Sequence, residues 1–423
     1  MITQEVIKGK GAGEGFRRFR LGQQGEYLGV QHAHDLVPVQ PFEGASNKTS
    51  VLVMRKGIQT TYPVPFTSWR RKARVGSIPT DATLSQALQL LDRYDLIAKP
   101  VSSSITSPWQ TLPATSVAAF SKLSGRAAYQ ARRGAGTDPY GVFWFEVTMV
   151  RDNGTVVANN LPELGHRDVP KREGVVLESA LMYPATRGAD ISRWHARPGV
   201  DVLLAQDPAT RNPIRGPDMR VRYPAAYRYL EGMRSILLSR GSNTVRELAE
   251  RTEPWAMFGI GPYTLAPFRV TWKRMASDMV AAVMGQWSTP YGAKPIIPTE
   301  TTAFIPVDDE AEAHFLAAIL NSVPIRLYIR TFSAPGRGFG APAILNHIAL
   351  PRFDGSLKEH QDLSELGRRA AHLAALGTAT SREELVLTEG LVDAAVATLF
   401  GIGQADLSAM RKTGLATRGL TLS

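Results

Sequence analysis

Cysteine is absent from the chain of 423 residues. Without it there can be no disulfide, no cysteine-ligated zinc, no iron–sulfur cluster and no cysteine nucleophile. No apolar run approaches the ~20 residues that cross a bilayer. Residues 1–16 contain no apolar core of the kind that a signal peptide needs. We therefore expect a cytoplasmic protein with no membrane association.

Short motifs that carry catalysis are absent as well. The sequence has no Gly-x-x-x-x-Gly-Lys-Ser/Thr phosphate loop, no His-Glu-x-x-His metal motif and no Gly-x-Ser-x-Gly nucleophile elbow. The eight histidines stand singly, apart from His32 and His34. No strand pattern precedes the glycine-rich segment at 9–15, so we interpret it as a flexible end. We expect no catalytic, cofactor or metal site in this chain.

The charge balance is strongly basic. Lysine and arginine outnumber aspartate and glutamate by 49 to 38, which gives a formal net charge of +11 and an isoelectric point near 9.8. Such an excess favours a polyanionic partner, because lysine and arginine displace condensed counterions from phosphates. A protein that is basic without a nucleic-acid role has the same composition, and composition does not distinguish RNA from DNA. The length indicates two or three domains.

Local patterns predict both strands and helices. Runs of β-branched and aromatic residues, bounded by glycine and proline, predict strands at 27–31, 50–57, 60–69, 142–150, 201–206, 268–275 and 301–307. The turn Asp152-Asn153-Gly154 makes the strand at 142–150 the first half of a hairpin. Helical spacing of apolar residues predicts helices at 83–96, 223–240, 309–322, 357–376, 381–402 and 404–412. Ser381 and Glu384 form a capping-box pattern.

Basic and aromatic residues are interleaved in four segments. Nucleic-acid surfaces combine these types, since guanidinium groups neutralise phosphates and bind guanine, while aromatic rings stack on bases. The candidate DNA-binding residues are Arg132, Arg133, Thr137, Tyr140, Arg187, Asp190, Arg193, Trp194, Arg269, Lys273, Arg274, Arg337 and Phe339.

Structural roles are the alternative for these segments. Asp190 can pair with a neighbouring arginine and fix its loop. Strand alternation places Arg269 and Lys273 on one face of the strand at 268–275, opposite its apolar residues. The glycine-rich loop at 333–343 is either a mobile loop that enters a DNA groove or a plain connector.

The segment YPATRGADISRW at 183–194 resembles a motif of the gamma-class N6-adenine DNA methyltransferases. These are the modification enzymes of type I, type IIG and related phage-defence systems, and the motif lies in their TaqI-like C-terminal specificity domain. Further segments are similar to that domain in the same order: 223–240, 257–275, 315–329, 348–354 and 392–413. Upstream, 34–69 resembles the last sheet strands of the methylase domain, so the resemblance covers roughly residues 27–412.

The catalytic half of that family is missing from this sequence. Its members carry a glycine-containing loop that holds S-adenosylmethionine and an Asn-Pro-Pro segment followed by Tyr or Phe. The asparagine hydrogen-bonds the amino group of the target adenine, and the aromatic residue stacks on the extruded base. This chain has no Asn-Pro-Pro, and its one Asn-Pro, Asn212-Pro213, lies in the part that resembles the specificity domain. The resemblance therefore implies a chain with no cofactor of its own, and S-adenosylmethionine bound by a catalytic partner.

We expect an α+β fold in four parts. They are edge strands of an incomplete methylase-like domain at 1–80, a linker helix and hinge at 81–107, a β-rich target-recognition domain at 108–355 and a helical segment at 356–423. The resemblance implies sequence-specific binding of double-stranded DNA as the specificity part of a split or truncated adenine methyltransferase. A separate methylase chain would pair with strands in 1–80. The alternative is an interaction or regulatory protein that is basic without a DNA role.

Overall fold

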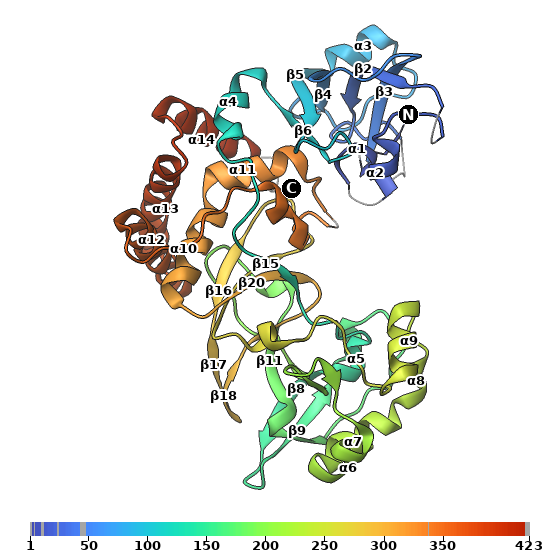
Figure 1. Ribbon diagram of the computed structural model, residues 1–423, viewed down its shortest axis with the longest axis vertical. Coiled ribbons are helices and arrows are strands. Elements are labelled where there is room, and N and C mark those ends of the chain that lie inside the picture. The colour runs from blue at the N-terminus through green and yellow to red at the C-terminus, as the bar shows by residue number, and fades with distance from the viewer. Residues whose placement is uncertain are drawn as a thin grey trace.

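The computed structural model describes residues 2–3, 5–9, 12–22, 25–42, 48–336 and 338–418. It shows the expected α+β fold, extended along one axis (Figure 1). A sheet built from residues 2–112 lies at one end, and a sheet built from residues 144–298 lies at the other (Figure 1). A third sheet lies between them, and the C-terminal helices lie to one side, on the left in the view (Figure 1).

The N-terminal sheet has the strand order β1-β3-β2-β4-β5-β6. Its strands are β1 (Ile2–Thr3), β2 (Leu28–Asp35), β3 (Thr49–Lys56), β4 (Val64–Arg71), β5 (Leu91–Pro100) and β6 (Trp109–Leu112). β2 and β4 are parallel, and the other neighbours are antiparallel. Val30, Phe66, Ala98 and Trp109 form a small core on one face, together with Ile7 from the short helix α1 (Glu5–Lys8). A second short helix, α2 (Ala12–Phe16), precedes β2.

The prediction of a helix at 83–96 is confirmed only for residues 84–89 and is wrong for the rest. α3 (Leu84–Gln89) has the capping box of Thr83 and Gln86 but buries no residue, and β5 begins at Leu91. β5 pairs with β4 over eight residues, from Val64 opposite Ala98 onward. Tertiary pairing and packing therefore outweigh a weak local helix preference. The N-terminal sheet continues through β6 and does not end near residue 80.

The central sheet has the order β16-β15-β20-β7. Its strands are β7 (Arg132–Arg133), β15 (Phe268–Lys273), β16 (Ala281–Met284) and β20 (Thr302–Val307). α10 (Glu310–Asn321) begins at the N-cap Asp309 with acidic residues in its first turn, as the sequence predicts. α10 and α11 (Val323–Phe332) share one buried core with Val270 and Trp272 of β15 and with α4 (Val117–Ser121).

The C-terminal segment is helical, as expected. It consists of α12 (Lys358–Leu376), α13 (Ala379–Leu399) and α14 (Gln404–Arg418). The cap of α13 differs from the expected one, because Thr378 accepts the hydrogen bond from the backbone N–H of Ser381 and the helix starts earlier. The segment 348–354, which resembles a closing strand, makes only an isolated bridge between Ile348 and Ser124.

The sheet at the far end has the order β10-β9-β8-β12-β11-β19. Its strands are β8 (Trp144–Val150), β9 (Thr155–Asn160), β10 (Val175–Glu178), β11 (Met182–Thr186), β12 (Val200–Leu203) and β19 (Ile297–Pro298). β8 and β9 form the predicted hairpin. The helix expected at 223–240 is interrupted at Met233, after Gly232, and becomes α7 (Pro224–Gly232) and α8 (Arg234–Leu238).

The remaining elements are short. They are α5 (Tyr140–Phe143), α6 (Gly216–Arg222), α9 (Asn243–Arg251), the strand pairs β13 (Gln206–Asp207) with β14 (Asn212–Pro213) and β17 (Gln286–Thr289) with β18 (Gly292–Pro295), and the 3-10 turns η1–η6. No helix among the described residues is long and apolar enough to span a membrane. The described residues also contain no group of three His, Asp or Glu side chains placed to hold a metal ion.

Asn321, the last residue of α10, joins this helix to the edge strand β16. Its buried amide Nδ2 donates to the backbone oxygen of Ala281 at 2.9 Å, and the backbone N–H of Ala281 donates to Asn321 Oδ1 at 2.8 Å. One side chain thus bonds both backbone groups of Ala281, whose oxygen also accepts from the backbone N–H of Trp194 at 2.9 Å.

We predict that Asn321→Asp destabilises the protein by at least about 2 kcal/mol, because the carboxylate cannot donate to the carbonyl of Ala281 and is itself desolvated. Urea unfolding measures the loss. The matched variant Asn243→Asp changes an exposed asparagine that accepts a hydrogen bond from Arg246, and should alter stability by less than about 0.5 kcal/mol. Equal stability of the two variants would contradict the structural role of Asn321.

Candidate nucleic-acid interface

The first predicted cluster lies on β7, at the edge of the central sheet. β7 pairs with β20, where Arg133 lies opposite Ala303 and Arg132 opposite Phe304, and no described strand pairs with its other edge. Successive strand residues point to opposite faces. The side chains of Arg132 and Arg133 therefore diverge, with Arg133 exposed and Arg132 half-buried.

Arg132 is held against an aromatic ring. Its Cζ lies 4.7 Å from the ring centroid of Tyr263, and its Nη2 donates to Gln130 Oε1 at 2.8 Å. Arg211, in the turn between β13 and β14, places its Cζ 6.0 Å from the centroid of the same ring. Cation–π contacts of this kind fix guanidinium groups without neutralising them. Two cations from distant segments are thus brought together beside Tyr263.

Sequence reasoning missed Tyr263 and Arg211. The signal for Tyr263 was its place in the segment 257–275, which resembles the specificity domain. Arg211 lies in a tight turn and has a left-handed backbone with φ of 62°, and no sequence pattern relates it to Arg132. Their proximity is a property of the tertiary fold.

The glycine-rich loop after β7 is fixed to the protein. The backbone N–H groups of Gly134, Ala135 and Gly136 donate to the carbonyl oxygens of Thr302, Pro298 and Phe258. A Cβ at Gly134 would collide with the carbonyl of Thr299, so glycine is required for this close approach.

Thr137 is fully buried, which corrects its assignment to the DNA-binding surface. Its hydroxyl donates to Glu300 Oε2 at 3.1 Å and accepts from Trp144 Nε1 at 2.7 Å. Tyr140 is half-buried and stacks on Trp144 with centroids 3.9 Å apart. Burial and Glu300 raise the pKa of the Tyr140 hydroxyl, and Arg133 opposes this shift. The cluster therefore anchors the loop behind Arg133.

Asp190 pairs with Arg187, which was one of the two alternatives for that segment. The guanidinium donates to both carboxylate oxygens, at 2.9 and 2.7 Å, and the backbone N–H of Arg187 donates to Oδ2 at 2.8 Å. A Cβ at Gly199 would overlap the carboxylate of Asp190, so this glycine leaves room for the pair. The fork geometry matches a bidentate arginine–carboxylate pair.

Arg193 and Trp194 face α13. Arg193 Nε lies 3.0 Å from Glu389 Oε1, and Trp194 Nε1 donates to the same oxygen at 2.8 Å. Trp194 is 3% exposed, so the structure corrects its assignment as a DNA-contacting residue. Both side chains join the segment at 183–194 to the helical C-terminus.

Arg269 is fully buried, and its DNA-binding assignment is therefore wrong. Its Nη1 donates to the carbonyls of Thr264 and Ala266 at 3.1 and 2.8 Å, and its Nη2 donates to the carbonyl of Gly285 at 3.0 Å. Burial lowers the pKa of Arg269 to about 10, so it remains charged at neutral pH. The prediction from strand alternation was wrong for Arg269, because loops cover the face of β15 that was expected to be exposed to solvent.

The last predicted residues lie where β15 meets the loop at 333–341. Lys273 and Arg274 are half-buried, and Arg274 Nη1 donates to the carbonyl of Glu300 at 2.5 Å. Phe339 is 1% exposed, which corrects its assignment as a side chain that enters a DNA groove. Arg337 lies outside the described residues.

On the central sheet, the predicted basic side chains that reach solvent lie on β7 and at the end of β15. Arg133 and Arg211 are exposed, and Arg132, Lys273 and Arg274 are half-buried. Guanidinium and ammonium groups can contact successive phosphates of a nucleic acid. Tyr263 adds an aromatic ring that positions two of the guanidinium groups.

Comparison with models of known protein families found no match, and comparison with curated protein sequences found none either. Among solved structures, the chain is similar to the type IIL restriction-modification enzyme MmeI, determined in complex with DNA. The sequence identity is 12% and the TM-score is 0.46. The match covers 93% of this chain and 46% of the MmeI chain, so this chain spans less than half of that enzyme's length. Similarity at this level does not establish a family.

Arg269 and Arg133 give a matched test of buried against exposed arginine. We predict that Arg269→Leu destabilises the protein by about 3 kcal/mol or more, because one buried and two partly buried carbonyls lose their donor. Arg133→Leu should change the stability by less than about 0.5 kcal/mol. Urea unfolding of both variants measures the difference. A stable Arg269→Leu protein with weakened DNA binding would restore Arg269 to the interface.

Proposed function

We propose that this chain binds double-stranded DNA sequence-specifically, as the specificity part of a split or truncated N6-adenine DNA methyltransferase in restriction-modification. The order of the segments that resemble the TaqI-like specificity domain supports this assignment. The structural observation that supports DNA binding is the placement of Arg132 and Arg211 on the ring of Tyr263, with the exposed Arg133 next to Arg132 on β7. These three side chains come from two segments of the chain, and β7 lies at one edge of the central sheet.

Phosphate contacts and base contacts have different consequences. Phosphate contacts supply affinity and fix the register on the duplex, whereas base-edge contacts supply sequence preference. Arg132 and Arg211, held against a ring, suit phosphate contact, since their positions are fixed before binding. Arg133 is exposed and stacks on no described aromatic ring, so its side chain suits a groove.

The catalytic step belongs to a partner in this proposal. The chain has no Asn-Pro-Pro segment and no cofactor loop in its sequence. A methylase chain that binds S-adenosylmethionine would flip the adenine while this chain holds the duplex.

The affinity for DNA should fall steeply with salt. We predict that replacing Arg132, Arg133 and Arg211 with glutamine reduces the slope of log K against log salt by about 2, since the two phosphate contacts proposed for Arg132 and Arg211 contribute about 0.9 each. Fluorescence anisotropy of a labelled duplex between about 50 and 200 mM salt measures the slope.

The matched control removes three exposed arginines from other elements, Arg220, Arg368 and Arg382. It has the same net charge as the first variant, and we expect its slope to equal that of the unmodified protein. Equal slopes for both triple variants would place the interface elsewhere. Failure of the unmodified chain to retain duplex DNA at low salt would favour the interaction protein without a DNA role.

The purified chain alone should transfer no methyl group to DNA. The measurement is incorporation of label from methyl-labelled S-adenosylmethionine into duplex DNA, with an intact adenine methyltransferase as the positive control. Incorporation above the level of a sample without protein would overturn the assignment of catalysis to a partner.

A further inference from the structure

A groove of about 480 Å³ lies between β10, the edge strand of the sheet at the far end, and the helix α7. α7 packs on β10 at the end of the molecule that is distant from the N-terminal sheet (Figure 1). The DNA-binding proposal uses none of the residues that line this groove.

The groove runs beside the edge of β10 and not over one face of the sheet. Val175 and Val176 both line it, although the side chains of successive strand residues point to opposite faces. β10 pairs with β9 along one side, and no described strand pairs with its other side. The outer edge of β10 is therefore available to a further strand.

The second wall of the groove is held in place by β10 and by the core of the sheet. Glu178, the last residue of β10, accepts from the backbone N–H groups of Ala225 and Ala226 in the first turn of α7, at 2.8 and 2.9 Å. The hydroxyl of Tyr229 donates to the carbonyl of Val142 at 3.0 Å. Peptides that add to a sheet edge gain affinity from main-chain hydrogen bonds and specificity from side-chain pockets beside that edge.

The lining of the groove is apolar apart from two arginines, and it contains no carboxylate. Arg172 precedes β10 and Arg228 belongs to α7, so positive charge comes from both walls. Both side chains are exposed, and no ion pair between described residues includes either of them. Arg228 Nε donates only to the carbonyl of Pro224, at 3.3 Å.

The position of Arg172 is fixed through its backbone. The buried Asn160 accepts from the N–H of Arg172 at 2.6 Å through Oδ1, and its own N–H donates to the carbonyl of Arg172 at 3.1 Å. Burial raises the pKa of the Tyr229 hydroxyl, and Asn160 and the charge of Arg172 oppose that shift. The charge of Arg172 therefore acts on the α7 wall as well as on its own.

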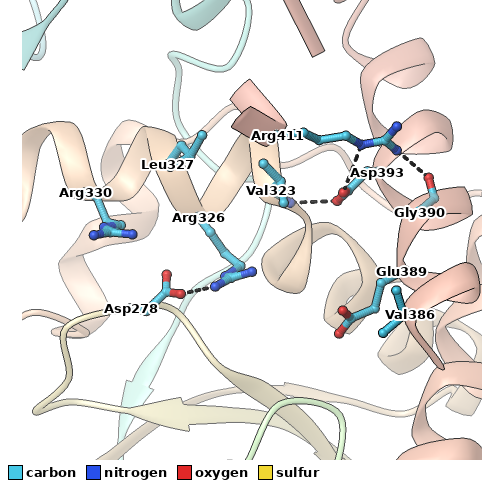
Figure 2. A pocket seen from close by; sticks show the side chains of 10 residues that line it. All are labelled: Asp278, Val323, Arg326, Leu327, Arg330, Val386, Glu389, Gly390, Asp393 and Arg411. Carbon is cyan, nitrogen blue, oxygen red and sulfur yellow. Dashed lines mark hydrogen bonds and ion pairs between the residues drawn. The ribbon is translucent and has the colours of Figure 1, made fainter. Parts of the chain in front are cut away.

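This excess charge distinguishes the groove from the cavity between α11, α13 and α14 (Figure 2). Three carboxylates and three guanidinium groups line that cavity. Asp278 pairs with Arg326 there, and Asp393 with Arg411 (Figure 2). The cavity lining has no excess of either charge, whereas the groove beside β10 is positive.

We propose that an extended acidic segment of a partner protein adds to the free edge of β10 in this groove. Its backbone would pair with β10, and its carboxylates would bind Arg172 and Arg228. Apolar side chains between the carboxylates would pack against Val175, Val176 and the ring of Tyr229. Main-chain pairing would supply affinity, and the two arginines would select negative charge.

Isothermal titration calorimetry of the full chain with three end-blocked hexapeptides tests the proposal. The peptides alternate Glu with Val, Lys with Val, and Glu with Pro. We expect the Glu–Val peptide to bind at least tenfold more tightly than the other two. Lysine reverses the charge, and proline keeps the charge of the glutamates but removes backbone N–H donors. Equal or tighter binding of either control peptide, or saturable binding by none of the three, would overturn the proposal.

Gly232, the last residue of α7, allows the groove to be filled without a clash. A Cβ at Gly232 would meet no atom, and the same holds for Gly390 of α13, which Figure 2 labels. Gly232→Phe should weaken binding of the Glu–Val peptide at least tenfold, because the ring occupies the groove. The matched variant Gly390→Phe should leave the affinity unchanged. Unchanged affinity in Gly232→Phe would contradict the site.

A double variant separates the peptide site from the DNA interface. Arg172→Gln with Arg228→Gln should weaken binding of the Glu–Val peptide at least fivefold and leave the salt dependence of DNA binding unchanged. Arg368→Gln with Arg382→Gln removes two exposed arginines of α12 and α13 and should change neither. Full peptide affinity in the first double variant, together with a smaller salt slope for DNA, would assign both arginines to the nucleic acid. The peptide titration contains no DNA, so its result does not depend on the proposed function.

Discussion

The buried guanidinium of Arg269 is the interaction on which the candidate interface depends. It ties the 3-10 turn η5 (Pro262–Leu265) to the corner at Gly285 through backbone carbonyls. A buried cation must keep its hydrogen bonds, because an uncompensated charge in the interior is very costly. The turn is therefore held rigidly on β15. Tyr263 lies in that turn, so a residue with no access to solvent determines where the guanidinium groups of Arg132 and Arg211 are placed.

The basic composition overstates the positive surface of this protein. Arg17, Arg240 and Arg269 are almost fully buried and donate to backbone carbonyls. Arg187 and Arg193 pair with carboxylates instead. These five arginines therefore stabilise the fold and are not free to contact a ligand. A net charge of +11 favours a polyanionic partner, but the net charge counts such buried and paired arginines together with the exposed ones.

The sequence predicted secondary-structure elements correctly where the spacing of apolar residues fitted either a helix or a strand and not both. The β8–β9 hairpin and the helices α10 and α12 follow from their turn, cap and apolar spacing. β5 was missed because its partner β4 is distant in sequence, and strand pairing is decided by that partner. For the site, the pairing of Asp190 with Arg187 is local and was foreseen as an alternative. The burial of Thr137 and Phe339 depends on packing against residues distant in sequence, which the residue types alone do not predict.

The edges of the N-terminal sheet limit how a methylase partner can attach within the proposed function. One edge strand, β6, packs against α11, where Gln110 donates to Thr331 Oγ1 at 3.2 Å and Thr111 to the carbonyl of Thr331 at 3.3 Å. The other edge strand, β1, is two residues long. β2 and β4 have partners on both sides, but β1 pairs only with Thr49 and Ser50 of β3. Strand addition requires free backbone donors and acceptors along an edge, and no described strand pairs with the outer edge of β3 from Val51 to Lys56. A methylase strand, in the proposed function, would therefore add along β3, on the side of the sheet opposite β5 and β6.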